Sequence, residues 1–439
     1  MRNNLWCTWI HFAAAVTICS LGQVVALADD SAALKQPVSV SHGSAAATSV
    51  SSTLDSQGYW STAIETSDER SKAVATCCDW CVPRWSARID GLMWWTKGNQ
   101  VPALVTTSPN GTDRTEAGVL SQPGTSILHG AELLDDNYRM GGRVSLGYWL
   151  DDCHTNAFDL TWFSIGDGAN TGNYYSQSTG SPILARPFFD AESGVQNAEL
   201  VAFPSVVEGG IEVLTSSELH SISALLRHNS YRGCCGRLDV VAGYRFLRFR
   251  EGLTIEENLT STDPGGVVAV GTTFDLLDSF STGNEFNGAE LGVALQMDHG
   301  VWSWDILAKL AMGNMHQVVD IGGFTRVTAP VGAPVVSEGG LLALPTNIGR
   351  VSHDKFAMIP ELNLNMQYQL CERLDVSLGY SMVWITSAVR SGDQVDFAVN
   401  PSQLPGNGGV LNGAARPAPR FETTSMWVQG INLGLVYQF

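Results

Sequence analysis

The chain has 439 residues, of which 15% are charged and 44% hydrophobic, with 45 glycines and 13 tryptophans. A charged fraction this far below the roughly 25% of soluble proteins is typical of a β-barrel with a polar lumen and an apolar outer wall. The formal net charge of −18, from 25 basic and 43 acidic residues, argues against a nucleic-acid partner, because phosphates require a basic surface.

The N-terminus predicts export. Arg2 precedes an apolar run from Leu5 to Leu27, and Ala26-Leu27-Ala28 forms an A-x-A cleavage site. We expect residues 1–28 to be a cleaved signal peptide; an uncleaved membrane anchor is the less favoured alternative. Residues 29–84 begin with a stretch rich in Ser, Ala and Thr, and we expect them to form a disordered, cysteine-containing periplasmic segment.

Ten segments then alternate with period two, which predicts strands with one apolar face. Many exceed the roughly 9–11 residues that a tilted membrane strand needs. In chain order they are Trp85–Trp95, Gly141–Leu150, Asn156–Gly166, Ser217–His228, Arg237–Arg250, Phe286–Asp298, Val301–Met315, Phe356–Leu370, Leu374–Thr386 and Ser425–Phe439. The last of these, ending on Phe439, resembles the terminal signature that the barrel-assembly machinery reads.

The connections between these strands alternate strictly between long and short. This is the pattern of an outer-membrane barrel, with long loops outside and short turns in the periplasm. It predicts ten strands, or twelve if Thr272–Ser279 forms an extra strand rather than extending a neighbour. The connections are Thr96–Met140, Asp151–Thr155, Asp167–Ser216, Asn229–Gly236, Glu251–Glu285, His299–Gly300, His316–Lys355, Cys371–Arg373 and Ser387–Thr424.

Aromatic residues gather at both ends of these strands, as expected for two belts at the membrane interfaces. Those at the loop side are Trp94, Trp162, Phe246, Phe286, Phe356, Trp384 and Trp427. Those at the turn side are Tyr148, Trp302, Trp304, Tyr368 and Tyr437.

Several phrases resemble the planctomycete β-barrel porins of type seven, formerly a domain of unknown function. They are Asp90-Gly91 with Trp94-Trp95, Leu104-Val105-Thr106, Gly118-Val119-Leu120 with Gln122-Pro123-Gly124-Thr125, Gly141-Gly142-Arg143 with Gly147-Tyr148-Trp149-Leu150 and Cys153, and Asp278-Ser279-Phe280-x-Thr282-x-Asn284-x-Phe286-x-Gly288. The resemblance covers roughly Cys77–Phe439. It implies an outer-membrane barrel of poorly defined function and brings no catalytic or binding residues.

Seven cysteines remain once Cys7 and Cys19 leave with the signal peptide. All lie in the pre-barrel segment or on short turns, where an oxidising periplasm favours structural disulfides. Cys78-x-x-Cys81 is half of a zinc pattern without a second half, so metal binding is the weaker alternative and no metal or cofactor is expected. The disulfide candidates are Cys77, Cys78, Cys81, Cys153, Cys234, Cys235 and Cys371.

Polar and charged residues occupy the inward face of the predicted strands. They form either a charged constriction that selects solutes or a filled lumen in which the charges pair among themselves. A ten-strand barrel lies between the filled eight-stranded barrels and the open porins. The lumen-lining candidates are Arg88, Asp90, Arg143, Asp159, Asp239, Arg245, Glu290, Asp305, Lys309, Glu361, Asn363, Asn365, Gln367 and Asp375.

The sequence therefore predicts an all-β, transmembrane, antiparallel up-and-down barrel over residues 85–439, located in the outer membrane. The favoured function is a porin-like channel for passive diffusion of small polar solutes. The alternative is a non-conducting structural or surface-interaction barrel, and inward folding of the long loops would discriminate between the two. No motif of a known enzyme occurs in a fitting context, so we expect no enzyme. Expected partners are outer-membrane lipid, the barrel-assembly machinery and, for a homo-oligomer, further copies of the chain.

Overall fold

The computed structural model describes residues 49–54, 60–65, 83–134, 136–166, 172–233, 235–406 and 411–439. The chain divides into two units, 1–76 and 77–439. In the first unit, β1 (Ser49–Leu54) and β2 (Trp60–Glu65) pair as an antiparallel hairpin, where the sequence predicted a disordered segment. The predicted signal peptide, 1–28, lies outside the described residues.

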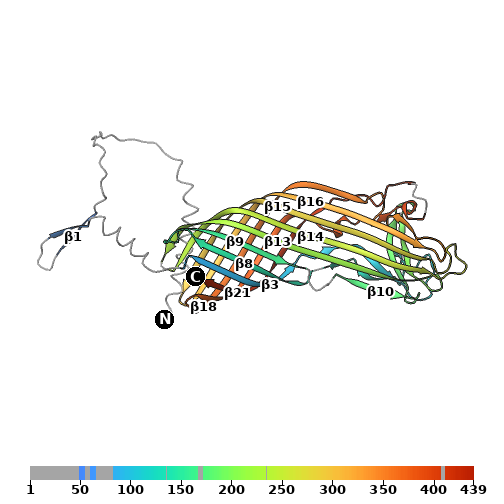
Figure 1. Ribbon diagram of the computed structural model, residues 1–439, viewed down its shortest axis with the longest axis horizontal. Coiled ribbons are helices and arrows are strands. Elements are labelled where there is room, and N and C mark those ends of the chain that lie inside the picture. The colour runs from blue at the N-terminus through green and yellow to red at the C-terminus, as the bar shows by residue number, and fades with distance from the viewer. Residues whose placement is uncertain are drawn as a thin grey trace, which may run out of the picture. The chain divides into compact units, whose positions relative to one another are not determined.

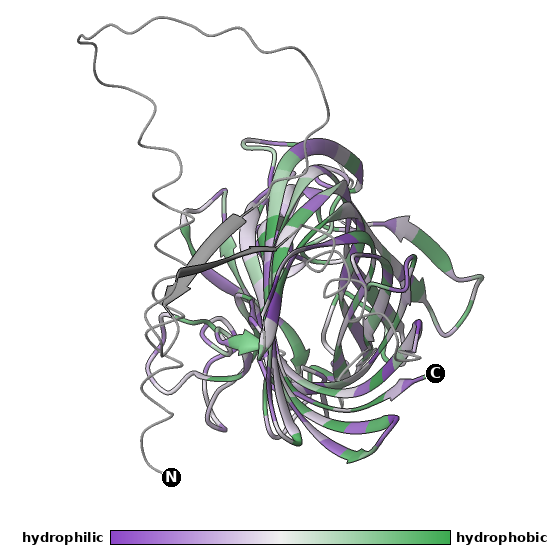
Figure 2. Cartoon of the chain, turned by 90° about the vertical axis from the view of Figure 1, so that its left-hand side faces the viewer, coloured by the Kyte–Doolittle hydropathy of each residue, from purple (hydrophilic) through white to green (hydrophobic). Residues whose placement is uncertain are grey.

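The second unit contains a twelve-stranded antiparallel sheet, ten strands of which close into a ring. Each ring strand pairs with its neighbours along the chain, and the last pairs with the first, which confirms the up-and-down barrel (Figures 1 and 2). The ring strands are β3 (Trp85–Thr96), β8 (Tyr138–Trp149), β9 (Asn156–Ile165), β13 (Val207–Gly233), β14 (Gly236–Ser261), β15 (Thr273–His299), β16 (Trp302–Thr328), β18 (Gly349–Cys371), β19 (Leu374–Val389) and β21 (Thr423–Gln438).

Four ring strands are far longer than a membrane requires. β13, β14, β15 and β16 have 26 or 27 residues each, against the roughly 9–11 that span a bilayer. Much of the predicted loops Asp167–Ser216, Glu251–Glu285 and His316–Lys355 is therefore strand. Thr272–Ser279 belongs almost entirely to β15, so it extends a ring strand and adds none (Figure 1).

The side-chain pattern inverts along these long strands, and the inversion marks the membrane boundary. On the turn side of Phe246 in β14, exposed Val240 and Tyr244 point outward while Asp239 and Arg245 are buried. Beyond Phe246 the outward side chains become polar, and the inward ones become Leu253, Ile255 and Leu259. A strand whose outer face is apolar is expected where the barrel wall meets lipid. A strand whose outer face is polar and whose inner face is apolar is expected where the wall meets water. The loop-side halves of these strands thus stand outside the bilayer.

The aromatic belts need two corrections. Trp162, Phe356 and Trp384 are exposed on the outer wall at the loop-side boundary, as expected for a belt. Trp94 and Phe286, which the sequence analysis assigned to the same belt, are buried inside the barrel. Trp94 has an even residue number like the inward-facing Asp90 on the same strand, and Phe286 shares this parity with the inward-facing Glu290. The two-residue period itself therefore places both aromatic side chains inward.

The loops carry a second, smaller sheet on the loop side of the ring. Its strands are β5 (Ala103–Thr107), β6 (Ser126–Gly130), β11 (Leu184–Asp190), β12 (Val195–Ala202) and β20 (Ala398–Val399). The remaining short elements are β4 (Asn99–Gln100), β7 (Leu133–Leu134), β10 (Tyr174–Ser178), β17 (Val335–Glu338), η2 (Gly392–Gln394) and η3 (Pro401–Gln403). β10 pairs with β13, and β17 pairs with β16, which brings the barrel sheet to twelve strands.

The turns at the opposite end are short, as predicted. β15 and β16 are joined by Gly300 and Val301, one residue later than the predicted His299-Gly300 turn. Gly300 has φ 65°, a conformation that two-residue hairpin turns favour and that glycine adopts without strain. Among the described residues, no helix is long and apolar enough to cross a membrane.

Candidate functional site: the barrel interior

Charged side chains pair between neighbouring strands on the turn-side part of the lumen wall. The Arg227 guanidinium lies 2.8 Å from Asp159 Oδ2 and 3.0 Å from Asp239 Oδ2. Arg237 approaches the same Asp239 oxygen at 3.3 Å. Two predicted lumen carboxylates are thus neutralised by arginines from β13 and β14, and Arg227 was not among the candidates.

A second ion cluster lies deeper in the membrane segment, around Asp90 of β3. Its carboxylate accepts hydrogen bonds from Arg88 Nε at 2.9 Å and from Arg143 Nε at 2.8 Å. Arg143 Nη1 also donates to Asn363 Oδ1 at 3.0 Å, and Arg88 Nη2 donates to Asn365 Oδ1 at 2.7 Å. Arg143 stands on β8 and Asn363 on β18, with β3, β21 and β19 between them in the ring, so this contact crosses the lumen.

The third cluster holds two cations and two anions. Arg245 Nη1 lies 3.1 Å from Glu290 Oε1 and also contacts Glu361. Lys309 Nζ bridges the same pair, 3.1 Å from Glu290 and 3.4 Å from Glu361. The formal charges cancel, and the side chains are between 0% and 8% exposed. These groups bind one another rather than water.

All the predicted lumen residues lie on the inward face of their strands. Ten of them form the clusters just described: Arg88, Asp90, Arg143, Asp159, Asp239, Arg245, Glu290, Lys309, Glu361 and Asn363. Asn365 accepts a hydrogen bond from Arg88, and Gln367 Nε2 donates one to Asp305 Oδ2. Asp375 is half-buried near the turn-side rim.

An apolar layer lies inside the barrel, on the loop side of the ion clusters. Trp94, Phe163, Phe249 and Phe286 are at most 4% exposed and belong to one buried cluster with aliphatic residues of the other strands. The Trp94 and Phe163 rings lie 5.3 Å apart between centroids, and Trp94 Nε1 donates to Asn432 Oδ1 at 2.7 Å. This layer separates the polar lumen from the loop-side interior.

The long loops fold inward and fill the loop-side part of the barrel. Loop residues Leu104, Leu184 and Leu342 share one buried core with ring residues such as Ile255 and Phe280. The phrase Leu104-Val105-Thr106, which carries part of the family resemblance, is the central part of β5 in this loop layer. The observation that was to discriminate the two functions therefore favours the filled barrel.

An ion cluster fixes the loop layer to the wall. Arg186 of β11 is 1% exposed; its Nη2 lies 2.7 Å from Asp278 Oδ2 of β15, and its Nη1 contacts Glu257 of β14. Glu199 of β12 lies opposite Arg186 in the β11–β12 register, close enough to interact with it electrostatically. Three carboxylates thus surround one buried guanidinium, and one oxygen each of Glu199 and Glu257 makes no hydrogen bond.

Asp278 also holds a second loop, between β17 and β18. Its Oδ1 accepts backbone N–H groups from Leu341 at 3.1 Å, Leu342 at 3.2 Å and Ala343 at 2.8 Å. One carboxylate thereby joins two loops, from the β9–β13 and β16–β18 connections. A third loop is tied by Arg390, whose Nη2 lies 2.6 Å from Glu251 Oε1 on β14.

The loop layer should loosen as the pH rises. Burial, with the charge of Glu257 beside it, raises the pKa of Glu199 from its ordinary 4.5 to about 8. A raised carboxyl pKa stabilises the folded loops fully below about 4.5, and that stabilisation is lost as the pH rises through about 8. We expect protease cleavage of the loops to accelerate over this range, measured by timed proteolysis of the folded barrel.

Glu199→Gln is expected to reduce that pH dependence, because the amide cannot ionise. Glu192→Gln serves as the matched control, since Glu192 is exposed at the turn between β11 and β12. Equal pH dependence in wild-type and Glu199→Gln protein would contradict the assignment.

Three of the predicted disulfide cysteines lie among the described residues. Cys153, Cys235 and Cys371 are exposed at the turn-side rim and form no disulfide with one another. Cys77, Cys78, Cys81 and Cys234 lie outside the described residues, so the disulfides predicted to involve them stay a prediction. Among the residues that the structure describes, no group of three His, Cys, Asp or Glu side chains is arranged to hold a metal ion.

The closed ring, the lipid-facing outer wall and the polar lumen define a transmembrane β-barrel of the outer-membrane class. The family model described as putative beta barrel porin-7 matches residues 85–439, and the chain belongs to this family. This confirms the resemblance seen in the sequence, whereas a planctomycete origin stays a prediction. The search of curated proteins finds no match.

Solved outer-membrane barrels resemble the chain only distantly. Outer membrane protease OmpT from Escherichia coli is 9% identical, with 82% of this chain and 98% of that chain covered and a TM-score of 0.39. The translocator domain of autotransporter NalP from Neisseria meningitidis is 11% identical, with 85% and 95% covered and a TM-score of 0.22. A Pseudomonas aeruginosa FadL homologue is 9% identical, with 83% and 92% covered and a TM-score of 0.24.

Proposed function

We propose that this protein is a closed outer-membrane barrel that serves as a structural or surface-interaction element, with its extended loop-side half as the platform outside the cell. The observation that carries the proposal is the filled lumen. Within the membrane, ion pairs line the lumen, and contacts of Arg143 with Asn363 and of Arg245 with Glu361 join strands that are not neighbours in the ring. An aromatic layer lies above them, and inward-folded loops lie above that layer. Ten strands enclose too little space for these layers and a wide aqueous path as well.

A porin-like channel for passive diffusion of small polar solutes is the second candidate. Its support is the polar turn-side half of the lumen, where Asp305, Glu361 and Asn363 line the wall, and the porin description of the family. Such a channel would need the loop layer and the aromatic layer to rearrange together. No known motif supports a catalytic role, and the barrel-assembly machinery and a homo-oligomer stay predictions.

Single-channel recording in a planar bilayer tests the proposal. We expect the purified, refolded full chain to give no stable conductance steps, because buried ion pairs and aromatic rings obstruct the lumen. Heat-modifiable migration on gels provides the control that the inserted protein is folded.

Stable ohmic steps from the wild-type protein would overturn the closed-barrel proposal and support the channel. In that case Glu361→Gln should lower any cation preference if the ion cluster forms the constriction. An unchanged selectivity in Glu361→Gln would place the conducting path elsewhere.

A further inference from the structure

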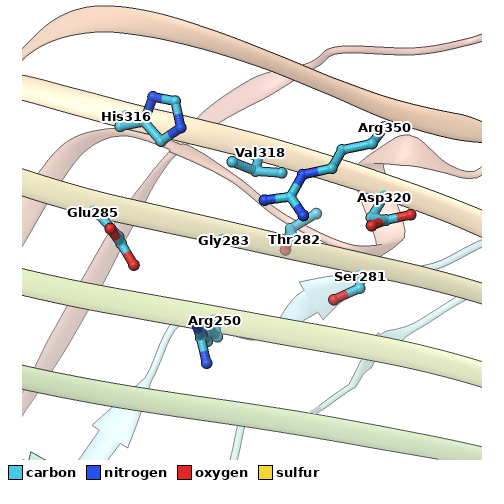
Figure 3. A pocket seen from close by; sticks show the side chains of 9 residues that line it. All are labelled: Arg250, Ser281, Thr282, Gly283, Glu285, His316, Val318, Asp320 and Arg350. Atoms are coloured by element: carbon cyan, nitrogen blue, oxygen red, sulfur yellow. The ribbon is translucent and has the colours of Figure 1, made fainter.

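The outer wall carries a polar hollow that the closed-barrel function does not use. It measures about 370 Å³ and lies over β14, β15, β16 and β18 on the loop side (Figure 3). Its lining includes Arg250, Gly283, Glu285, Asp320 and Arg350. On β14, β15 and β16 these residues alternate with buried ones, and Arg350 of β18 lies opposite Asp320 in the register, so the hollow faces away from the barrel interior.

The hollow exists because its floor has little side-chain bulk. Gly283 pairs with Arg250 on β14, and Ser281 pairs with Asp320 on β16. A Cβ added at Gly283 would meet no atom within 4 Å, so the space above the strand is open. Figure 3 shows Arg250 and Arg350 on opposite sides of Gly283.

The two arginines differ from their neighbours in having no partner. Within the lining, Glu285 lies 3.0 Å from Arg248 Nε, and His316 Nδ1 lies 3.0 Å from Asp354. Among the described residues, neither Arg250 nor Arg350 makes a side-chain hydrogen bond or ion pair. Of the two lining carboxylates, Glu285 is paired with Arg248, and Asp320 lies opposite Arg350 in the β16–β18 register. The formal charges of the lining therefore cancel, while in the part of the chain that the structure describes neither guanidinium of the hollow is in an ion pair.

The hollow lies just beyond the loop-side edge of the lipid-facing wall. The exposed ring of Phe356 marks the edge of the lipid-facing wall on β18. Arg250 lies four residues beyond Phe246 on β14, roughly 13 Å along a tilted strand at about 3.3 Å per residue. Arg350 lies six residues from Phe356 on β18, roughly 20 Å along the strand, so both guanidinium groups stand beyond the hydrocarbon and would meet a lipid only through its head group.

We propose that Arg250 and Arg350 bind the phosphate head group of an outer-leaflet lipid in the hollow floored by Gly283 and Ser281. A guanidinium presents donors that match phosphate oxygens two at a time, and two such groups facing one space suit a phosphate monoester. Asp320 weakens the site, since it places a negative charge beside the ligand. The proposal is independent of whether the barrel conducts.

Native mass spectrometry of the detergent-purified full chain tests this site. The probes are short-chain phosphatidic acid, which carries a phosphate monoester, and phosphatidylcholine with the same acyl chains. We expect preferential retention of phosphatidic acid. Arg250→Gln and Arg350→Gln should each weaken its binding about fivefold, the effect typical of one basic residue at a membrane surface. Asp320→Asn should strengthen the binding.

Arg326→Gln is the matched control, because Arg326 lies on the outer wall of β16 beyond the hollow, 3.9 Å from Asp275. It should leave lipid retention unchanged. Undiminished binding of phosphatidic acid by the Arg250→Gln/Arg350→Gln double variant, with heat-modifiable folding intact, would overturn the proposal. In a final experiment, inorganic phosphate competes with phosphatidic acid. Displacement of phosphatidic acid by equimolar phosphate would show a site for free anions and refute lipid binding.

Discussion

Replacing Arg245 by Met is expected to destabilise the barrel by about 3–5 kcal/mol, the typical cost of removing one partner from a buried ion cluster. The methionine would fill similar space but leave Glu290 and Glu361 with Lys309 as their only cation. Two carboxylates that share one ammonium carry an uncompensated negative charge inside the membrane. The free energy of unfolding, measured by urea titration of the protein in lipid vesicles, should fall accordingly.

Arg248→Met is the matched control for this change. Arg248 lies on the same strand and pairs with Glu285, but it faces outward and is about one-third exposed. Its loss should cost less than about 1 kcal/mol. The Arg245→Met/Glu361→Gln double variant should recover part of the stability, because it removes the surplus charge. If Arg245→Met and Arg248→Met were equally stable, the lumen cluster would be solvated and the filled-barrel interpretation wrong.

Replacing Asp278 by Ala is expected to free the loop layer while leaving the barrel ring intact. The substitution removes the acceptor of three backbone N–H groups and one carboxylate partner of Arg186. Losing a charged acceptor for buried donors costs about 2–5 kcal/mol. The ring has its own backbone ladder, so the loss should appear locally, as rapid protease cleavage within the β16–β18 connection.

Asp278→Asn should have an intermediate effect, since its amide oxygen still accepts hydrogen bonds but no longer pairs ionically with Arg186. Asp275→Asn, three residues away and on the outer wall of β15, is the matched control and should leave cleavage unchanged. Hydrogen exchange can confirm that the ring stays protected. Unaltered cleavage in Asp278→Ala would show that apolar packing alone retains the loops.

The sequence predicted the membrane part of the barrel well, because each strand repeats one local rule. From Phe356 to Leu370, for example, every second residue faces lipid and the others face the lumen, so the period of the chain determines both faces. The alternation of short turns with long connections gave the strand order for the same local reason. Trp94 and Phe286 were misplaced where belt statistics were preferred to the alternation itself.

The loop-side half could not be predicted in this way. There β14 continues beyond Phe246 with its apolar residues turned inward, so the expected outward pattern ends while the strand does not. The contacts of Arg186 with Glu257 and Asp278 join residues 71 and 92 positions apart. Arg227, by contrast, is four residues from the inward-facing Ser223 on the same strand. The two-residue alternation of that strand therefore predicts that Arg227 also faces the lumen.

The sequence alone determined the closed sheet, its strand order and the faces of the membrane segment, because a strand's two faces follow from a period of two residues. Only the tertiary structure showed that charged side chains pair inside the membrane segment and that the long loops fold into the barrel. Pairing between Arg143 and Asn363, and packing of Leu342 against the ring, depend on which side chains meet across a barrel whose strands are far apart in the chain. Local periodicity carries no information about such encounters.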